Sequence, residues 1–363
     1  MARHAPVELP RFFLVGPRYG HHSTFSGFEG FRKFLNISSV PSPVKSRFLS
    51  HRLGTIWGLG DVGWRIDQLT ALLTPRPLYS LGVLGIELST AFHMLRRSRS
   101  LYHVLYGDTD VWLMNYLKKI GDHRVVATFH DSVPILEWLR IDKIASRLDA
   151  VILLSSVHVP YFRRFLPPER IFLVPHGVDT EFFCPAGPLT REPICLTVGS
   201  KLRDFKTFAG AIDRVLSVNP KVRFIAVGAR RTDPNVPSLV HSHVEFVDGI
   251  TDLQLLSLYR SARMGVFPLL DATANNALLE AMACGLPVVV TDVGGIRDYA
   301  GVGIGRLCKL GDPEDLAASI LDLLEDKIEI PSRGAASRKQ AEKFSFPLVA
   351  QQMRRAYESV FRL

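Results

Sequence analysis

The sequence has few cysteines, and none of them is arranged for a structural bridge or a metal. The 363 residues include four cysteines, which form no Cys-x-x-Cys pair and have no nearby histidine at the spacing of a zinc ligand. This pattern argues against a disulfide scaffold and a structural zinc site. It is typical of reduced and mostly buried thiols in an intracellular protein.

Long hydrophobic runs, internal repeats and low-complexity tracts are also missing. The first ten residues lack the apolar core of a signal peptide. The most apolar early stretch, Leu78–Leu95, is interrupted by Glu87 and His93 and falls short of a clean membrane-spanning length. We interpret it as a buried or interfacial helix, and we expect a cytoplasmic protein without a transmembrane segment.

Acidic residues are scarce in the first half of the chain. Residues 1–179 hold 22 Lys+Arg against 14 Asp+Glu (+8) and residues 180–363 hold 22 against 21 (+1), which together give the formal charge of +9. The excess favours an anionic partner, such as headgroups at the inner surface of a membrane, a polyanion or a phosphorylated acceptor. An ordinary solvated basic surface is the alternative. No nucleic-acid motif accompanies the basic residues, so we expect no nucleic-acid partner.

The dominant pattern is a series of short apolar runs, each followed by a turn and then by helical periodicity. This pattern is typical of parallel sheets in α/β proteins. The chain also exceeds the usual size of one domain. The candidate strands form two sets, each sufficient for one Rossmann-like, doubly wound domain. They are Phe12–Val15, Leu101–Leu105, Val125–Phe129, Ala150–Leu154 and Ile171–Val174, then Ile194–Val198, Arg223–Val227, Val244–Val247, Met264–Phe267 and Pro287–Thr291.

A linker separates the two sets of strands. Residues 185–193 contain three prolines and a glycine, which disfavour a helix. We therefore expect one domain over residues 1–184 and a second over residues 185–345. A last helix within residues 346–363 is expected to pack back near the first domain.

The strongest candidate site lies within residues 266–291. An apolar strand leads into a loop of small residues and then into a helix that begins near Asn276. The small residues let a ligand approach the backbone, and a helix N-terminus offers N–H groups to phosphate. Glu280, about one turn inside the helix, can accept two hydrogen bonds from a diol such as ribose. A solvent-facing glutamate on an amphipathic helix is the alternative.

Three segments resemble the family-4 retaining glycosyltransferases: LLEAMACGLPVVVTD at 278–292, VPHGVDTEFF at 174–183 and TVGS at 197–200. The resemblance covers residues 171–300 and is weaker before them. It implies the GT-B fold, in which two domains face a cleft, and transfer from a nucleoside-diphosphate sugar without a cofactor or an obligatory metal. It also implies that residues 1–184 bind the acceptor and residues 185–345 the donor. Glu280 would bind ribose, with Asn275, Asn276, Ala277 and Leu279 completing the site at the helix start.

The chain departs from the family pattern at two positions. The family carries a second glutamate eight positions before the first, where this chain has Ala272; Asp271, one residue away, can partly substitute. The family's arginine after Val-Gly is Ser200 here, so Arg203 and Lys206 become the candidates for stabilising the diphosphate. A solvated basic turn is the alternative for both.

Other candidate residues lie at the ends of strands. Gly294 and Gly295 permit close approach of a donor sugar or phosphate, although such pairs also occur in plain turns. In the first domain, Ser26 and Gly27, with His21 and His22, follow the first strand and are expected at the cleft edge. His130 ends another strand, and the resemblance implies that it contacts the donor sugar.

Some residue patterns point away from a site. His103 lies inside a strand and is expected in the core, and His176 is expected at the hinge. Asp108-Thr-Asp110 matches a metal-binding Asp-x-Asp motif, but no feature of the second half fits the fold that uses it. Two other functions stay open: a non-hydrolysing sugar-nucleotide epimerase, for which no acid/base carboxylates are identified, and a catalytically reduced binding protein, suggested by Ala272 and Ser200.

Overall fold

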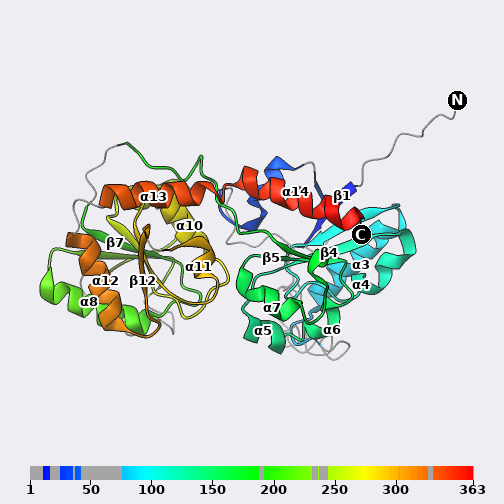
Figure 1. The fold of residues 1–363 in the computed structure, drawn as a ribbon, viewed down its shortest axis with the longest axis horizontal. Helices are drawn as coiled ribbons and strands as arrows, with labels where there is room; N and C mark the ends of the chain where they lie inside the picture. The colour runs from blue at the N-terminus through cyan, green and yellow to red at the C-terminus, as the bar shows by residue number, and fades with distance from the viewer. Residues whose placement is uncertain are drawn as a thin grey trace, which may run out of the picture.

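The strands form two separate parallel sheets of six strands each. The computed structural model describes residues 11–16, 25–35, 37–41, 76–187, 192–230, 236, 244–301, 303–325 and 330–362. His21 and His22 lie outside these residues. The two sheets belong to two bodies that lie side by side (Figure 1). Among the described residues, none of the helices has the length and hydropathy needed to cross a bilayer.

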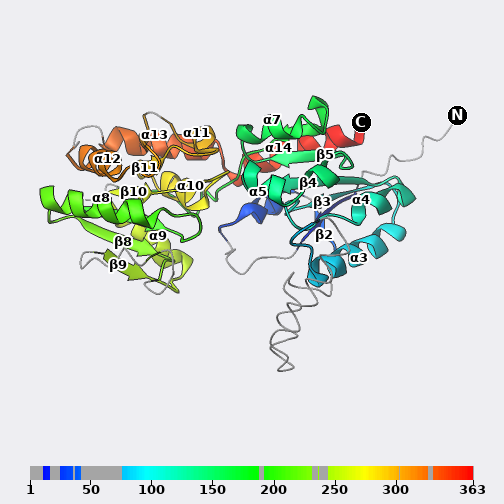
Figure 2. The same cartoon turned by 90° about the horizontal axis from the view of Figure 1, so that it is seen from below.

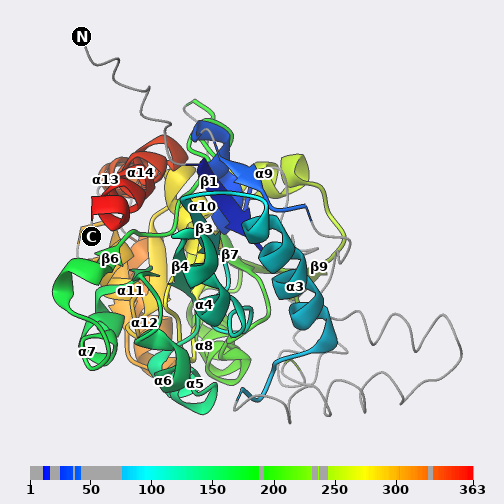
Figure 3. The same cartoon turned by 90° about the vertical axis from the view of Figure 1, so that its right-hand side faces the viewer.

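The first sheet has the strand order β2-β1-β3-β4-β5-β6. Its strands are β1 (Arg11–Val15), β2 (Ser38–Ser39), β3 (Ser100–Val104), β4 (Arg124–Phe129), β5 (Ala150–Leu153) and β6 (Ile171–Leu173). One face packs against α3 (Leu81–Leu95), α4 (Met114–Leu117), α5 (Val133–Trp138), α6 (Asp142–Ala145) and α7 (Val159–Phe162). The other face packs against the 3-10 helix η1 (Phe28–Phe34) and the last helix, α14 (Phe346–Arg362). Figure 3 shows α3 and α14 on opposite sides of the strands.

The second sheet has the order β12-β11-β10-β7-β8-β9. Its strands are β7 (Ile194–Val198), β8 (Arg223–Val227), β9 (Val244–Val247), β10 (Met264–Phe267), β11 (Val288–Thr291) and β12 (Gly305–Cys308). One face is covered by α9 (Asp252–Ser261), α10 (Asn276–Ala283), α11 (Ile296–Tyr299) and α13 (Ile330–Glu342). The other face is covered by α8 (Phe205–Val218) and α12 (Pro313–Glu325). Figure 1 shows α10 and α13 above this sheet and α8 and α12 below it, and Figure 2 gives the view from below. The expected doubly wound α/β architecture is confirmed.

All ten expected strands are present, with ends that differ by at most one residue, and two further strands were not expected. β2 is two serines long, and β12 has the sequence GRLC. Neither contains an apolar run, so the pattern that predicts the other strands does not find them. Each is defined by its pairing with the neighbouring strand. A side chain at Gly305 would lie within 1.7 Å of the Val288 carbonyl oxygen, so β12 packs tightly on β11.

The last helix returns to the first domain. α13 and α14 run one after the other along one side of the molecule (Figure 1). α14 begins at Phe346 and buries one apolar side that includes Met353 and Tyr357. The phenyl ring of Phe346 fills the space beside Gly30 and Gly177, where an added Cβ would lie within 2.0 and 2.6 Å of it.

A buried hydrogen bond fixes α14 to the sheet. His103 is fully buried in β3, as expected; its Nδ1 lies 2.6 Å from the Tyr357 hydroxyl and its Nε2 lies 2.6 Å from Thr128 Oγ1. Burial lowers the pKa of His103 to about 3, so the ring is neutral at physiological pH. A neutral ring has one donor and one acceptor, and both are used here.

Tyr357→Phe is therefore expected to lower the free energy of unfolding by about 1–3 kcal/mol, because it leaves a ring nitrogen of His103 buried without a partner. Chemical denaturation of the wild type and the variant measures the change. The exposed Tyr116→Phe is the matched control and should change stability by less than about 0.5 kcal/mol. Equal stability of Tyr357→Phe and wild type would contradict this role of the hydrogen bond.

Candidate active site

The two sheets bring the carboxyl ends of their strands toward each other. In the second sheet the chain proceeds from β7 to β8 on one side and returns to β10 on the other, so the strand order reverses between β7 and β10. Ligands of open α/β sheets bind at such a reversal. The loops that leave β7 and β10 pair here: Asp204 N–H donates to the Pro268 carbonyl (2.9 Å) and Leu270 N–H to the Leu202 carbonyl (3.0 Å).

Glu280 lies at this point, in the second turn of α10. Asn275 caps α10, accepting a hydrogen bond from Leu278 N–H (3.0 Å), so the helix starts at Asn276 as expected. Glu280 is only 4% exposed. Its carboxylate accepts hydrogen bonds from the Ser26 hydroxyl of the first domain (2.5 Å) and the Tyr259 hydroxyl of α9 (3.0 Å). The solvent-facing alternative for Glu280 is therefore wrong.

Burial determines the protonation of this carboxyl. It raises the pKa of Glu280 to about 7, although the two hydroxyl donors favour the charged form. Glu280 is thus near the midpoint of its titration at physiological pH. A carboxylate that already accepts from two hydroxyl groups has the chemistry required to accept from a diol.

Tyr259 is a site residue that sequence reasoning missed. It is fully buried in α9, and its hydroxyl lies within hydrogen-bonding distance of both the Glu280 carboxylate and the Ala277 carbonyl oxygen. An aromatic residue on the apolar side of a helix predicts only a core position, so no signal in the sequence distinguishes it.

The two candidate cations differ in their surroundings. Arg203 is 8% exposed, and its guanidinium donates to the backbone carbonyls of Val198 (2.5 Å) and Lys201 (3.3 Å). Burial lowers its pKa to about 10, so it stays charged at neutral pH. Gly199 has φ +89°, and an added Cβ there would lie 3.0 Å from the guanidinium. Lys206 is exposed, in the first turn of α8. The solvated-turn alternative thus fails for Arg203, whereas the exposed Lys206 fits both that alternative and a contact with diphosphate.

The two glycines lie against the loop that carries Ala272. Gly295 N–H donates to the Ala272 carbonyl (2.8 Å). A Cβ on Gly294 would lie 2.1 Å from that same oxygen, and one on Gly295 would lie 2.3 Å from the Thr273 carbonyl. The absence of side chains is therefore required by packing between loops. Asp271 Oδ1 accepts from Ala272 N–H (2.8 Å) and stabilises the same turn.

The residues at the start of α10 separate into two groups. Asn276 is partly exposed and Ala277 is 8% exposed, and their N–H groups belong to the helix's first turn. Leu279 is fully buried in the core of the second domain. Its N–H donates to the Asn275 carbonyl (3.2 Å). We therefore correct the expectation for Leu279, which supports the helix from the core side.

His130 lies on the first-domain side of the site. Its backbone N–H donates to the Asp108 carboxylate (3.0 Å), and its Nε2 lies 2.8 Å from the Leu105 carbonyl oxygen, to which it donates. The ring stacks on Tyr106 and meets Phe28 edge-on at centroid distances of 4.8 and 5.0 Å. The loop that holds Phe28 also carries Gly27, at φ 112°, and Ser26. One short loop therefore connects the surroundings of His130 with Glu280.

The Asp-x-Asp motif stabilises a turn. Asp108 is buried and accepts hydrogen bonds from the N–H groups of His130 and Asp131. Burial, together with the neighbouring Asp131 carboxyl, raises the pKa of Asp108 to about 7. Within the described part of the chain, no cluster of three or more His, Cys, Asp or Glu side chains is arranged to hold a metal ion.

Further polar contacts join the two domains. Asp298 of α11 accepts hydrogen bonds from the Ser155 hydroxyl (2.6 Å) and from both the N–H (2.6 Å) and the hydroxyl (2.7 Å) of Ser156. The Tyr299 hydroxyl accepts from His176 N–H (2.9 Å) and donates to a carbonyl at the end of β5. The structure thus places His176 between the domains, where a hinge residue is expected.

Asp298→Asn is expected to weaken the contact between the domains, because an amide oxygen accepts hydrogen bonds less strongly than a carboxylate. We expect a larger radius of gyration by small-angle X-ray scattering and a melting temperature lower by a few degrees. Asp292→Asn is the matched control, since Asp292 pairs with Arg297 inside the second domain. Identical scattering for both variants would show that Asp298 does not hold the domains together.

Comparison with known proteins identifies the second domain. The family description "Glycosyl transferases group 1" matches residues 192–326, which include Arg203, Lys206, Tyr259 and Glu280. Over these residues the second domain is similar to this family. Over 220 residues it is 28% identical to a D-inositol 3-phosphate glycosyltransferase of Thermobispora bispora, covering 53% of this chain and 51% of that protein. The match thus spans about half the length of that relative.

Other known proteins match more of the chain. It is 23% identical over 273 residues to a GDP-mannose-dependent monoacylated alpha-(1-6)-phosphatidylinositol monomannoside mannosyltransferase of Corynebacterium glutamicum, covering 67% of this chain and 72% of that protein. HepE of Anabaena, solved in complex with UDP, superposes with a TM-score of 0.69 at 15% identity, covering 97% of this chain and 100% of that one. A sucrose-phosphate synthase of Thermosynechococcus elongatus has a TM-score of 0.65 at 22% identity, with coverages of 77% and 78%. The fold is GT-B.

Proposed function

We propose that this protein is a retaining glycosyltransferase that moves a sugar from a nucleoside-diphosphate sugar to a hydroxyl acceptor. The main support is Glu280, a buried carboxylate at the strand-order reversal of a group 1 domain that already accepts hydrogen bonds from two hydroxyl groups. On this proposal residues 185–345 bind the donor and residues 1–184 the acceptor. The helix within 346–363 then ties the donor domain back to the acceptor domain.

In the proposed reaction, the acceptor oxygen forms a bond to the anomeric carbon while the bond from that carbon to the diphosphate oxygen breaks. The acceptor's proton passes to the departing diphosphate, so the products are a glycoside and a nucleoside diphosphate. Attack on the face that the diphosphate leaves retains the anomeric configuration. No side-chain nucleophile and no metal is required.

Each candidate residue has one part in this scheme. Glu280 accepts the ribose hydroxyls, while Arg203, Lys206 and the first turn of α10 stabilise the charge of the diphosphate. His130 contacts the donor sugar from the first domain. Contact between the domains excludes water, which would otherwise hydrolyse the donor.

The acceptor side is proposed from charge. Two of the relatives act, by their names, on an inositol phosphate and on a phosphatidylinositol mannoside. We propose that the acceptor is a lipid or saccharide hydroxyl and that the basic first domain contacts an anionic membrane.

A catalytically reduced binding protein is the second candidate. The observation that favours it is Ala272, whose methyl side chain stands where the family has a carboxylate and whose carbonyl is engaged by the Gly294–Gly295 turn. A site without that carboxylate would keep ribose and diphosphate contacts and lose one contact to the sugar.

A panel of radiolabelled nucleotide sugars, offered with lipid and saccharide acceptors, tests the proposal. Transfer of label to an acceptor supports a glycosyltransferase. Binding of a nucleotide sugar, seen as a thermal shift, with neither transfer nor hydrolysis would overturn the enzyme in favour of the binding protein.

A further inference from the structure

The helix α3 is apolar on two sides, and only one of them packs on the sheet. Ile86 and Met94 are buried against the first-domain core, whereas Leu88, Phe92 and Leu95 have exposed fractions of 52%, 56% and 63%. The exposed three are spaced four and three residues apart, so they form one stripe along the helix. A contiguous apolar stripe of this kind usually marks a surface that contacts a partner.

The carboxyl end of α3 continues the stripe into a basic region. The Arg96 guanidinium lies over the Phe92 ring at 3.9 Å. The neighbouring 3-10 helix η2 (Lys118–Gly121) is joined to this end by a hydrogen bond from Arg99 N–H to the Gly121 carbonyl (3.0 Å). It adds Ile120, which is 62% exposed, and the exposed Lys119.

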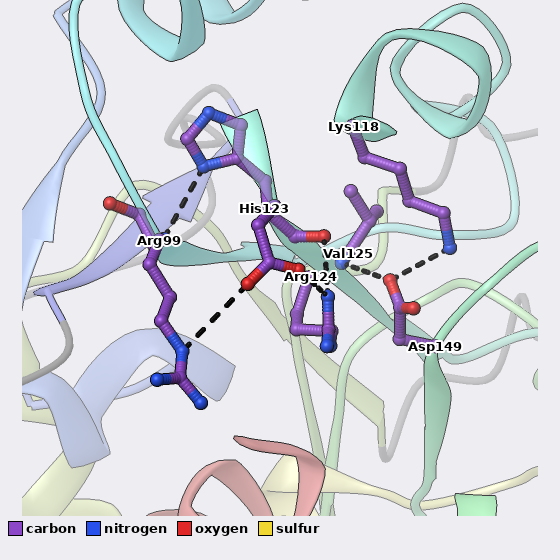
Figure 4. Close-up of polar contacts among 8 residues, drawn as sticks. Arg99, Lys118, His123, Arg124, Val125 and Asp149 are labelled. Atoms are coloured by element: carbon purple, nitrogen blue, oxygen red, sulfur yellow. Dashed lines mark hydrogen bonds and ion pairs between the residues drawn. The ribbon is translucent and has the colours of Figure 1, made fainter. Parts of the chain in front are cut away.

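The acidic side chains at this end are already paired. Figure 4 shows Lys118 paired with Asp149; their N–O distance is 2.8 Å. The Asp122 carboxylate lies 3.9 Å from the Arg99 guanidinium and 2.8 Å from that of Arg124. Six cations therefore face two carboxylates. The cations are Arg96, Arg97, Arg99, Lys118, Lys119 and Arg124. In the part of the chain that the structure describes, no ion pair involves Arg96, Arg97 or Lys119, so the excess positive charge faces outward.

We infer that the exposed side of α3, with η2, docks the first domain on an anionic lipid bilayer. This α3–η2 surface gives a location to the membrane contact proposed above and rests on that proposal. Leu88, Phe92 and Leu95 enter the headgroup region, and the basic residues pair with lipid phosphates, the combination that holds interfacial helices on membranes. A second copy of the chain fits less well, because a twofold contact would bring the excess positive charge of each copy against that of the other.

The docking surface is rigidly connected to the acceptor side of the site. Glu87, on the buried side of α3, accepts hydrogen bonds from the N–H groups of Trp112, Leu113 and Met114 at 2.7, 2.9 and 3.1 Å. These residues follow the Asp108 turn that holds the backbone of His130. A bilayer bound to α3 therefore lies at a fixed position relative to the acceptor side.

Sedimentation with vesicles of equal parts phosphatidylglycerol and phosphatidylcholine tests the inference on the full chain. We expect Phe92→Asp with Leu95→Asp to reduce binding at least tenfold, and Arg96→Gln with Lys119→Gln to reduce it roughly tenfold and to weaken its salt dependence. Leu253→Asp is the matched control, since Leu253 is 66% exposed on α9 of the second domain, and it should bind as the wild type does. The additional tryptophan fluorescence of the Phe92→Trp variant should be quenched by brominated lipids.

The outcomes separate this inference from the proposed function. The thermal shift with nucleotide sugars should be the same in the α3 variants and the wild type, which shows that they are folded. The docking surface would be overturned if the wild type did not bind the anionic vesicles, or if the Phe92/Leu95 variant bound them equally well. Neither result would change the proposal for the donor site. A wild-type dimer that the same variant dissociates would assign the surface to a second copy instead.

Discussion

Glu280→Gln is expected to weaken the binding of a nucleoside-diphosphate sugar by roughly 1–3 kcal/mol, the cost of losing charge-assisted hydrogen bonds at a buried site. The amide has one oxygen to accept with, and its NH2 group would face the Ser26 and Tyr259 hydroxyls that now donate to the carboxylate. Isothermal titration with UDP- and GDP-sugars measures the change.

The control is Glu245→Gln, a solvent-exposed glutamate on β9 that pairs with Arg223. It should bind the donor as the wild type does. If folded Glu280→Gln also bound the donor with unchanged affinity, Glu280 would be removed from the site.

The same side chain makes donor binding depend on pH. Because the pKa of Glu280 is raised to about 7, the carboxylate that we propose as the acceptor for ribose hydroxyls is increasingly protonated below pH 7. Donor affinity should fall as pH falls, toward about tenfold per pH unit, in the wild type and much less in Glu280→Gln. An identical pH profile for the two proteins would contradict the assignment.

The contribution of Glu280 to the free energy of unfolding should show the opposite pH dependence and fall as pH rises. A carboxyl whose pKa is raised in the folded state holds its proton more tightly there, so its contribution to stability is complete below about pH 4.5 and is lost as pH rises through about 7. The loss amounts to about 3 kcal/mol. Asp108 titrates in the same range, so the difference between wild type and Glu280→Gln at pH 5 and pH 8 isolates the part that belongs to Glu280.

Lys206→Ala is expected to weaken the binding of nucleoside diphosphates by about 1–2 kcal/mol and that of nucleoside monophosphates by less, because the proposed partner of this ammonium group is the outer phosphate. Lys206 is a sharper probe than Arg203. Arg203 also donates to the Val198 and Lys201 carbonyls, so its removal would disturb the loop itself.

Titration with UDP, UMP, GDP and GMP measures both effects. Lys221→Ala, another exposed lysine of the second domain, is the matched control and should change neither affinity. An equal loss for diphosphates and monophosphates in Lys206→Ala would assign the lysine to general electrostatic attraction and contradict a contact with the outer phosphate.

The fold was predictable where local sequence decides the structure. The ten expected strands each lie in a run of four or five largely apolar residues, and such runs can be recognised directly in the sequence. The start of α10 was predictable for a similar reason, since Asn275 is a good N-cap and lies next to the residues that it caps. β12 was not, because its sequence is ordinary and its partner β11 supplies the pairing.

The site was predictable only in part, because its decisive contacts join distant parts of the chain. Ser26 and Glu280 are 254 positions apart, and Ser155 and Asp298 are 143 apart. The sequence places each of these residues near a strand end but does not indicate its partner. Tyr259 and Leu279 illustrate two opposite errors. Tyr259 was not predicted and contacts Glu280, whereas Leu279 was predicted as a site residue and lies in the core.

The return of α14 to the first domain has a consequence for how the protein is made. The core beneath η1 includes Leu14 and Phe28 from the start of the chain and Met353 and Tyr357 from its last helix. During synthesis one apolar face of the first sheet therefore stays without α14 until the whole second domain has been translated. Exposed apolar surface of this kind favours chaperone binding, and a ribosome that stalls before residue 346 would release a first domain without its covering helix. The domain that is translated first is thus the last to be completed.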